Sequence, residues 1–296
     1  MINAPAKGIS IFTATMLIVS FIFSNPSFCL TSDIDWKEIK GDHFILYFTE
    51  DKDFDKAKDI LDKAEVYYRR IATELGYPRY SEFWTWDNRV KIYIYPTREL
   101  YLKATEQPSW SYGMADYRKK IIASYTGSQE FIDSILPHEM AHLIFRDFVG
   151  FRGEVPLWLD EGVAQWEEEL KRQPIKGIVR DLYLGDQLLS LSDLMSLDIR
   201  HIDADKKVYM RQIRGRDGQK GVLILNGENL VKTYYIQSVS VVGFLIEKYG
   251  SISFAAFCRQ LRDGKSLEEA LRFAYPTIHG TDELEDRWKE YLKEGV

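Results

Sequence analysis

His138-Glu139-Met140-Ala141-His142 is the stretch that decides how this chain folds, together with Pro156-Leu157-Trp158-Leu159-Asp160-Glu161 downstream. Side chains four residues apart share one face of a helix, so both histidines can reach one metal ion with Glu139 beside it. Catalytic zinc uses three protein ligands and an open position, and two histidines with one glutamate form such a set. Proline suits the first turn of a helix, so Pro156 predicts a second helix that carries Glu161 as the third ligand.

Each histidine has a simpler explanation when it is taken alone. Beside Leu136, Leu143 and Ile144, a histidine could be a hydrogen-bonded residue of the core. That explanation must also treat Glu139 and Glu161 as accidents. The complete pattern therefore favours a metal centre with Zn2+ as its ion.

The same residues resemble a known family, the glutamate-zincin (gluzincin) peptidases. The two-histidine helix paired with Trp158-Leu159-Asp160-Glu161-Gly162-Val163-Ala164 looks like the small bacterial peptidase-MA-like domains and, more distantly, the zinc aminopeptidases. The similarity extends from about Trp36 onward. It implies an α+β, zincin-like fold: a mixed β-sheet N-terminal lobe, an active-site HExxH helix and a helical C-terminal lobe. It also implies that His138, His142 and Glu161 bind Zn2+.

Three further segments extend the resemblance. Gly113-Met114-Ala115-Asp116-Tyr117 and then Ile121-Ile122-Ala123-Ser124 resemble the glycine-led turn and edge strand on which such enzymes lay the substrate backbone. Tyr235-Ile236-Gln237-Ser238 resembles the helix that offers a tyrosine to the reacting carbonyl, so Tyr235 is the expected oxyanion donor; a packing role is the alternative. Asp116 stands near where the aminopeptidases hold a free amine, but the surrounding motif differs from theirs.

The expected chemistry is peptide-bond hydrolysis by water that the metal activates. Glu139 would act as general base, taking the proton of the water and later passing it to the departing amine. Asp160 and Gln165 are candidates to orient a ligand histidine. The sequence thus predicts an exported zinc metallopeptidase, a protease acting on polypeptide. Two alternatives remain: a non-catalytic zinc-binding or scaffold module of the same fold, and an amidase acting on a cell-wall peptide.

The first residues predict a targeting segment. Lys7 precedes an apolar stretch from Ile9 to Phe23, which Ser24-Asn25-Pro26 ends. A core of about fifteen residues fits a signal peptide, whereas a spanning helix needs about twenty. Residues 1–29 are therefore expected to be a signal peptide or an uncleaved N-terminal anchor, and the protein to be periplasmic or extracellular. Cys29 raises the alternative of a lipid anchor, although bulky Phe28 matches that signal poorly.

The remaining chain, residues 30–296, is expected to form one metallopeptidase domain. A sheet lobe would span 30–128, and the metal helix with the helical lobe would span 129–296. The net charge of −6 argues against nucleic acid as a partner. A basic, glycine-containing stretch from Arg211 to Lys220 predicts a solvated loop rather than an anionic partner site. Contact with a membrane is expected only through the N-terminal segment, and no signal for an oligomeric state is present.

Hydrophobic periodicity predicts the secondary structure along this domain. Strands are expected at 43–48, 89–95 and 121–124, and helices at 55–75, 99–105, 187–197 in part, 238–249, 251–261, 266–273 and 282–292. The metal helix is expected over 133–148 with Ser134 as cap, or from Gln129 with a kink at Pro137. Region 199–232 fits the family least, with 222–225 as a strand of an inserted hairpin. His43, His201 and His279 are expected at the surface.

Overall fold

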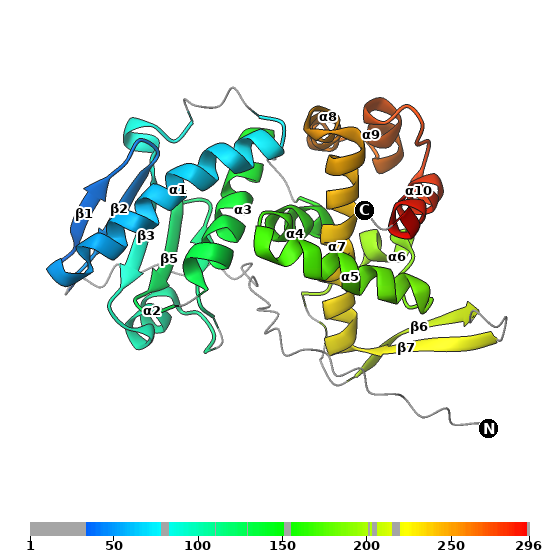
Figure 1. Cartoon of the computed structure of the whole chain (residues 1–296), viewed down its shortest axis with the longest axis horizontal. Helices are drawn as coiled ribbons and strands as arrows, with labels where there is room; N and C mark the ends of the chain where they lie inside the picture. Colours follow the sequence, from blue (N-terminus) through cyan, green and yellow to red (C-terminus); the bar gives the residue numbers. More distant parts are fainter. Residues whose placement is uncertain are drawn as a thin grey trace.

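The computed structural model describes residues 34–77, 83–109, 111–128, 130–150, 155–200, 202, 206–214 and 220–294. These form an α+β protein in which a five-stranded mixed sheet with its helices lies beside a helical array that carries a two-stranded hairpin (Figure 1). The expected leader, residues 1–29 with Cys29, falls outside the described residues. Within those residues no helix is long and apolar enough to cross a membrane.

The five-stranded sheet has the order β1-β2-β3-β5-β4. Its strands are β1 Lys37–Lys40, β2 Phe44–Phe48, β3 Val90–Tyr95, β4 Met114–Asp116 and β5 Ile121–Tyr125. The three central strands β2, β3 and β5 run parallel, whereas β1 and β4 pair antiparallel at the two edges. The three predicted strands are confirmed.

The expectation of an edge strand at Ile121–Ser124 is wrong. That segment is β5, which lies between β3 and β4, and the edge is formed by the short strand β4. The chain folds back between the two strands, so Met114 pairs with Ala123 and Asp116 with Ile121. The glycine-led segment itself therefore forms the edge of the sheet.

Helices cover both faces of the five-stranded sheet. Helix α1, Phe54–Glu74, follows the 3-10 turn η1 at Asp51–Asp53 and buries an apolar stripe that includes Ile60, Leu61 and Ile71. This confirms the predicted amphipathic helix. The opposite face is covered by helix α2, Arg98–Thr105, which Thr97 caps as an acceptor for the Leu100 N–H, and by stacked aromatic rings. A further 3-10 turn, η2, spans Trp86–Asn88.

The metal helix α3 spans Leu136–Val149 and continues backward into a π-helical turn, η3, at Phe131–Ile135. The predicted cap at Ser134 is therefore wrong, because Ser134 lies inside the wide turn and its hydroxyl donates to Glu168. Pro137 does lie in the first turn of α3, as predicted. Proline removes a backbone donor there, and a π-turn accommodates the altered ladder. The helix ends at Gly150, whose positive φ of 79° suits glycine.

The helical array follows the metal helix in the chain. It consists of α4 Leu157–Trp166, α5 Glu169–Leu184, α6 Leu191–Ser196, α7 Gly227–Tyr249, α8 Ser251–Arg262, α9 Leu267–Ala274 and α10 Thr281–Glu294. The helices predicted near α6, α8, α9 and α10 are confirmed. Helix α7 begins eleven residues earlier than the predicted Ser238. Helix α5 was not predicted, because it contains Pro174 and buries only Val179.

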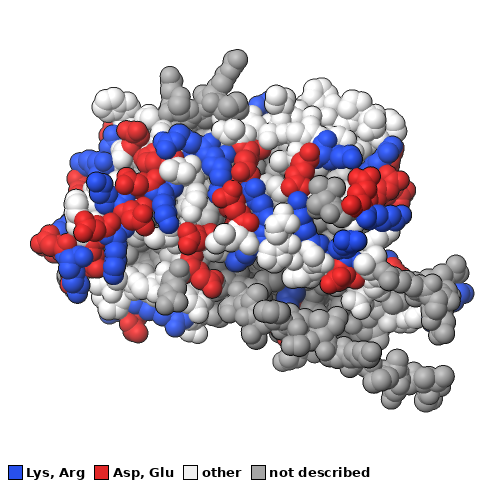
Figure 2. Space-filling view, viewed as in Figure 1, with Lys and Arg blue, Asp and Glu red and all other residues white. Residues whose placement is uncertain are grey.

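The expected strand at 222–225 is confirmed as part of a hairpin formed by β6, Lys207–Arg214, and β7, Lys220–Asn226. The segment predicted as a loop, Arg211–Lys220, is longer than the connection between the two strands, because Arg211 lies within β6 and Lys220 begins β7. Elsewhere, on the face that carries α1 and α5, basic and acidic side chains alternate (Figure 2).

The surface position expected for His43 is wrong, whereas His279 is exposed as expected and His201 lies outside the described residues. His43 is buried, its Nδ1 lies 2.6 Å from the Glu65 carboxylate, and its ring stacks on Tyr68 at 4.0 Å. The Glu65 carboxylate gives the buried imidazole a hydrogen-bond partner in place of water.

Close packing of α4 on α7 depends on Gly162, the residue after Glu161. A methyl group there would lie 2.7 Å from the Ser238 backbone oxygen and 2.7 Å from the Val242 side chain. We expect Gly162→Ala to lower the free energy of unfolding by about 1–3 kcal/mol, because overpacking forces one helix away. Urea denaturation measures this change.

The matched control is Gly177→Ala on helix α5. An added methyl at Gly177 meets nothing within 4 Å, so the better helix propensity of alanine should raise stability by roughly 0.5–1 kcal/mol. Equal responses of the two variants would contradict the packing argument.

Candidate metal centre

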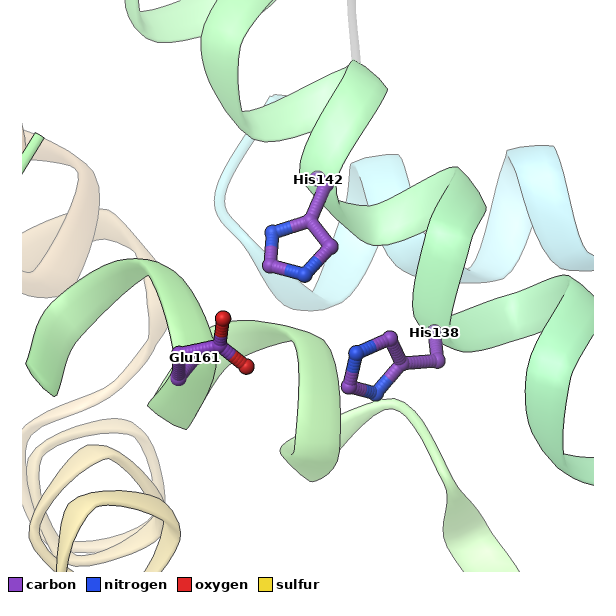
Figure 3. A group of neighbouring side chains, drawn as sticks. All are labelled: His138, His142 and Glu161. Carbon is purple, nitrogen blue, oxygen red and sulfur yellow. The ribbon is translucent and has the colours of Figure 1, made fainter. Parts of the chain in front are cut away.

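Helices α3 and α4 bring together the three side chains predicted as metal ligands. His138 and His142 project from α3, and Glu161 approaches them from the facing helix α4 (Figure 3). One ligand atom from each of the three residues lies within 4.8 Å of the other two. His138 and Glu161 are buried and His142 is half-buried. The spacing in the sequence has therefore placed all three predicted side chains around one point.

The local sequence explains why these helices face each other. The predicted second helix is α4, and Pro156 is its N-cap, directly before the first turn in which it was expected. Nine of the ten residues of that helix are buried. Helix α3 likewise buries its apolar residues, including Met140 and Ile144. Both helices lie inside the protein, so their polar residues need internal partners.

A carboxylate contacts the Nδ1 atom of each histidine. Glu168 lies 2.9 Å from Nδ1 of His138, and Asp160 lies 3.0 Å from Nδ1 of His142. Carboxylates placed in this way favour a proton on Nδ1 and fix the ring orientation. Nε2 is then the atom that each ring can offer to a cation.

Basic side chains hold these two carboxylates in the ionised form. Burial alone would raise the pKa of Glu168, but the hydrogen bond and charge of His138, followed by the ammonium of Lys171, lower it to about 2. Burial likewise opposes ionisation of Asp160, and the contacts with His142 and Arg146 lower the pKa of that carboxyl. Both orienting groups are therefore anions at neutral pH.

Several polar side-chain atoms at the centre are buried without a hydrogen-bond partner among the described residues. Oε2 of Glu161, Nε2 of His142 and Oε1 of Glu139 have no hydrogen-bond partner in the described part of the chain. Burial, followed by the charges of Asp160 and Glu139, raises the pKa of Glu161 well above its usual range. Leaving such atoms unpaired costs free energy, so they indicate a missing partner that accepts their lone pairs.

Glu139 lies next to the ligands and is linked to the edge strand. A backbone hydrogen bond from Ala115 of β4 reaches its carboxylate. Burial raises the pKa of Glu139 to about 7, with His138 opposing the shift and Glu168 adding to it. A carboxylate with such a pKa can both accept and return a proton near neutral pH.

Tyr235 lies on α7, one turn before Ser238, the residue that touches Gly162. Burial and then the charge of Glu161 raise its pKa well above the usual value. Burial and then the charge of Glu161 also raise the pKa of Tyr234. The charge of Glu161 therefore acts on both tyrosine hydroxyls.

Asp116 has a structural contact instead. Its side chain accepts hydrogen bonds from the backbone N–H groups of Arg118 and Lys119, each at 3.0 Å, and shapes a turn.

Of the two residues considered for orienting a ligand, Asp160 contacts His142. The partner of His138 is Glu168 rather than Gln165. Glu168 follows the end of α4, seven residues after Glu161, a spacing of two helical turns that could have drawn attention to it.

We expect Glu168→Gln to weaken zinc binding about 10- to 100-fold, because a neutral amide no longer supports the basicity of His138. A competition titration against a chromogenic chelator measures the affinity. Glu169→Gln is the matched control, since Glu169 pairs with Arg70 rather than with a histidine and is half-exposed. Equal affinities of the two variants would argue against the orienting role.

No known family profile and no curated protein matches this chain. One similar solved structure is the crystal structure of a functionally unknown conserved protein from Bacillus anthracis str. Ames. It is 11% identical in sequence with a TM-score of 0.42, and the match covers 88% of this chain and 51% of that one. This chain thus spans about half the length of that protein.

Proposed function

We propose that this protein is a zinc metallopeptidase with a zincin-like fold, in which His138, His142 and Glu161 hold Zn2+ and Glu139 is the general base. The observation that carries the proposal is the convergence of His138, His142 and Glu161 on one point, with a buried carboxylate of raised pKa beside them. Among the described residues, a buried atom of His142 and one of Glu161 lack a hydrogen-bond partner. The catalytic domain is residues 30–296, with its sheet lobe at 30–128. The segment before it is a leader for export to the periplasm or the cell exterior.

The charges around the centre fit a divalent cation. Four buried carboxylates meet there, and two basic side chains contact them. The carboxylates are Glu139, Asp160, Glu161 and Glu168, and the basic groups are Arg146 and Lys171. If all are ionised, two negative charges remain, and buried charges of one sign require a counter-ion. Two imidazoles and one carboxylate form a donor set that zinc accepts.

Zinc, when bound, polarises a carbonyl and lowers the pKa of water toward neutrality. Glu139 supplies the complementary step, because its carboxylate takes the proton as water attacks the peptide carbonyl. The same group can then protonate the leaving amine, and a pKa near 7 suits both transfers. The same donor set holds Fe(II) in some oxygenases, but a buried carboxylate directly after the first histidine favours hydrolysis.

The substrate is a peptide or polypeptide. The assay that tests the proposal compares linear peptides with cross-linked cell-wall peptides, using the exported protein and its Glu139→Gln variant as the blank. Cleavage of linear peptides above the blank supports a peptidase. Cleavage of the cell-wall substrates alone would replace the peptidase with an amidase, and bound zinc without any turnover would indicate a binding module.

We expect Tyr235→Phe to lower kcat about 10²- to 10³-fold, the usual cost of removing one oxyanion donor. KM and zinc content should stay unchanged, because the hydroxyl acts only on charge that develops during the reaction. Steady-state kinetics on a fluorogenic peptide measure both constants.

Tyr234→Phe is the matched control for Tyr235→Phe. It removes the neighbouring hydroxyl, which also feels the charge of Glu161, and should change kcat only a few-fold. If the two variants lose the same activity, or if Tyr235→Phe loses zinc, the proposed role of Tyr235 fails.

A further inference from the structure

The hairpin of β6 and β7 extends from the helical array (Figure 1). Its two faces differ in composition. Leu223 on the inner face is buried, and the hydroxyl of Tyr209 donates to Asp193 at 2.7 Å. The outer face carries Met210, Val222 and Ile224. These side chains are 72%, 57% and 46% exposed, and Met210 pairs directly with Ile224 across the strands. The hairpin is thus anchored on one face and presents an apolar ladder on the other.

The same hairpin concentrates positive charge in an acidic protein. From Lys206 to Asn226 the sequence contains six lysines and arginines against one aspartate, a net charge of plus five, whereas the whole chain carries −6. Lys206 and Lys220 are exposed at the hairpin, and Arg211 pairs with Asp186 at 3.4 Å. Exposed aliphatic side chains next to basic ones are the composition of an interfacial membrane element.

We propose that this hairpin docks the protein on an anionic lipid bilayer. Met210, Val222 and Ile224 enter the boundary between headgroups and acyl chains, and the neighbouring lysines contact lipid phosphates. This contact is separate from anything the N-terminal segment does, and it does not depend on the metal centre or on peptide hydrolysis.

Size and chemistry favour a bilayer over another macromolecule. A stable interface between two copies buries about 1,200–2,000 Å² in total, far more than three side chains provide. Single-stranded nucleic acid needs aromatic rings for stacking, whereas the ladder is aliphatic. Anionic lipid satisfies both the apolar ladder and the basic flank.

The test places an environment-sensitive nitrobenzoxadiazole label at Met210→Cys in the full chain. Cys29→Ser removes one competing thiol, and Cys258 is buried. The matched control is the same label at Ile252→Cys, an isoleucine that is 82% exposed. It belongs to helix α8, which lies at the end of the helical array away from the hairpin (Figure 1). Vesicles of phosphatidylcholine with phosphatidylglycerol are compared with vesicles of phosphatidylcholine alone.

The expected result is a blue-shifted, brighter emission from position 210 with anionic vesicles, a weaker change with neutral vesicles and none from position 252. Attachment through the N-terminal segment alone would leave both labels in water and would overturn the proposal. A blue shift that grows with protein concentration without vesicles would assign the ladder to self-association and would also overturn it.

Two double variants separate the contributions to docking. Val222→Ser with Ile224→Ser, and Lys206→Gln with Lys220→Gln, should each lower the fraction of labelled hairpins that dock roughly tenfold. Circular dichroism of each variant checks folding. If Met210→Cys fails to fold, Val222→Cys carries the label, and Met210→Ser with Ile224→Ser becomes the apolar double variant. Docking unchanged in both double variants would contradict the proposal.

Discussion

Glu139→Gln is expected to lower kcat for peptide hydrolysis by about 10²- to 10⁴-fold while one zinc ion per chain is retained. Glutamine has almost the shape of glutamate but cannot accept the proton of the attacking water. It is not among the three converging ligands, so the metal should stay. Parallel measurements of turnover and of metal content by mass spectrometry separate the two effects.

Glu130→Gln provides the matched control for the base. Glu130 is exposed and lies six residues before the first residue of α3, so its neutralisation should leave both turnover and zinc content unchanged. Comparable turnover by the Glu139 variant and the wild type would exclude Glu139 as general base. Loss of zinc from the Glu139 variant would show that the residue acts through the metal instead.

Glu161→Gln is expected to weaken zinc binding at least about 100-fold, because the amide removes both a charged ligand and its attraction for a divalent cation. Without metal, the Glu161→Gln variant should be at least as stable as the metal-free wild type. Burial and the charges of Asp160 and Glu139 already disfavour the ionised carboxyl, as its raised pKa indicates. A neutral amide avoids that cost.

Added zinc should therefore raise the Tm of the wild type but not the Tm of the Glu161→Gln variant. A ligand at about 1,000 times its Kd stabilises the native state by about 4 kcal/mol, so the wild type should gain several degrees in Tm that the variant does not gain. The same zinc-dependent rise in both proteins would place the ion elsewhere.

The convergence of the three predicted side chains followed from the sequence because its signals are local. Four-residue spacing on one helix and a proline at the start of the next were enough to place His138, His142 and Glu161. Glu168 was missed because its contact with His138 joins residues thirty positions apart and depends on how α4 crosses α3. The seven-residue spacing from Glu161 suggests a shared helix face, but it does not show which histidine Glu168 contacts.

The errors in the fold have the same origin. His43 is buried because Glu65, twenty-two residues later, lies beside its ring. The true edge of the sheet depends on how three residues of β4 fold back on β5. Each error concerns a contact between elements, which hydrophobic periodicity does not encode.

The most direct test of the metal centre is a crystal structure of the protein, purified without chelators, with anomalous diffraction measured at the zinc absorption edge. Elemental analysis of the same sample gives the zinc content per chain. One zinc ion per chain is expected, bound by both histidine Nε2 atoms at about 2.0–2.1 Å and by the Glu161 carboxylate at about 2.0–2.2 Å. Iron in that position, or zinc bound by other residues, would contradict it.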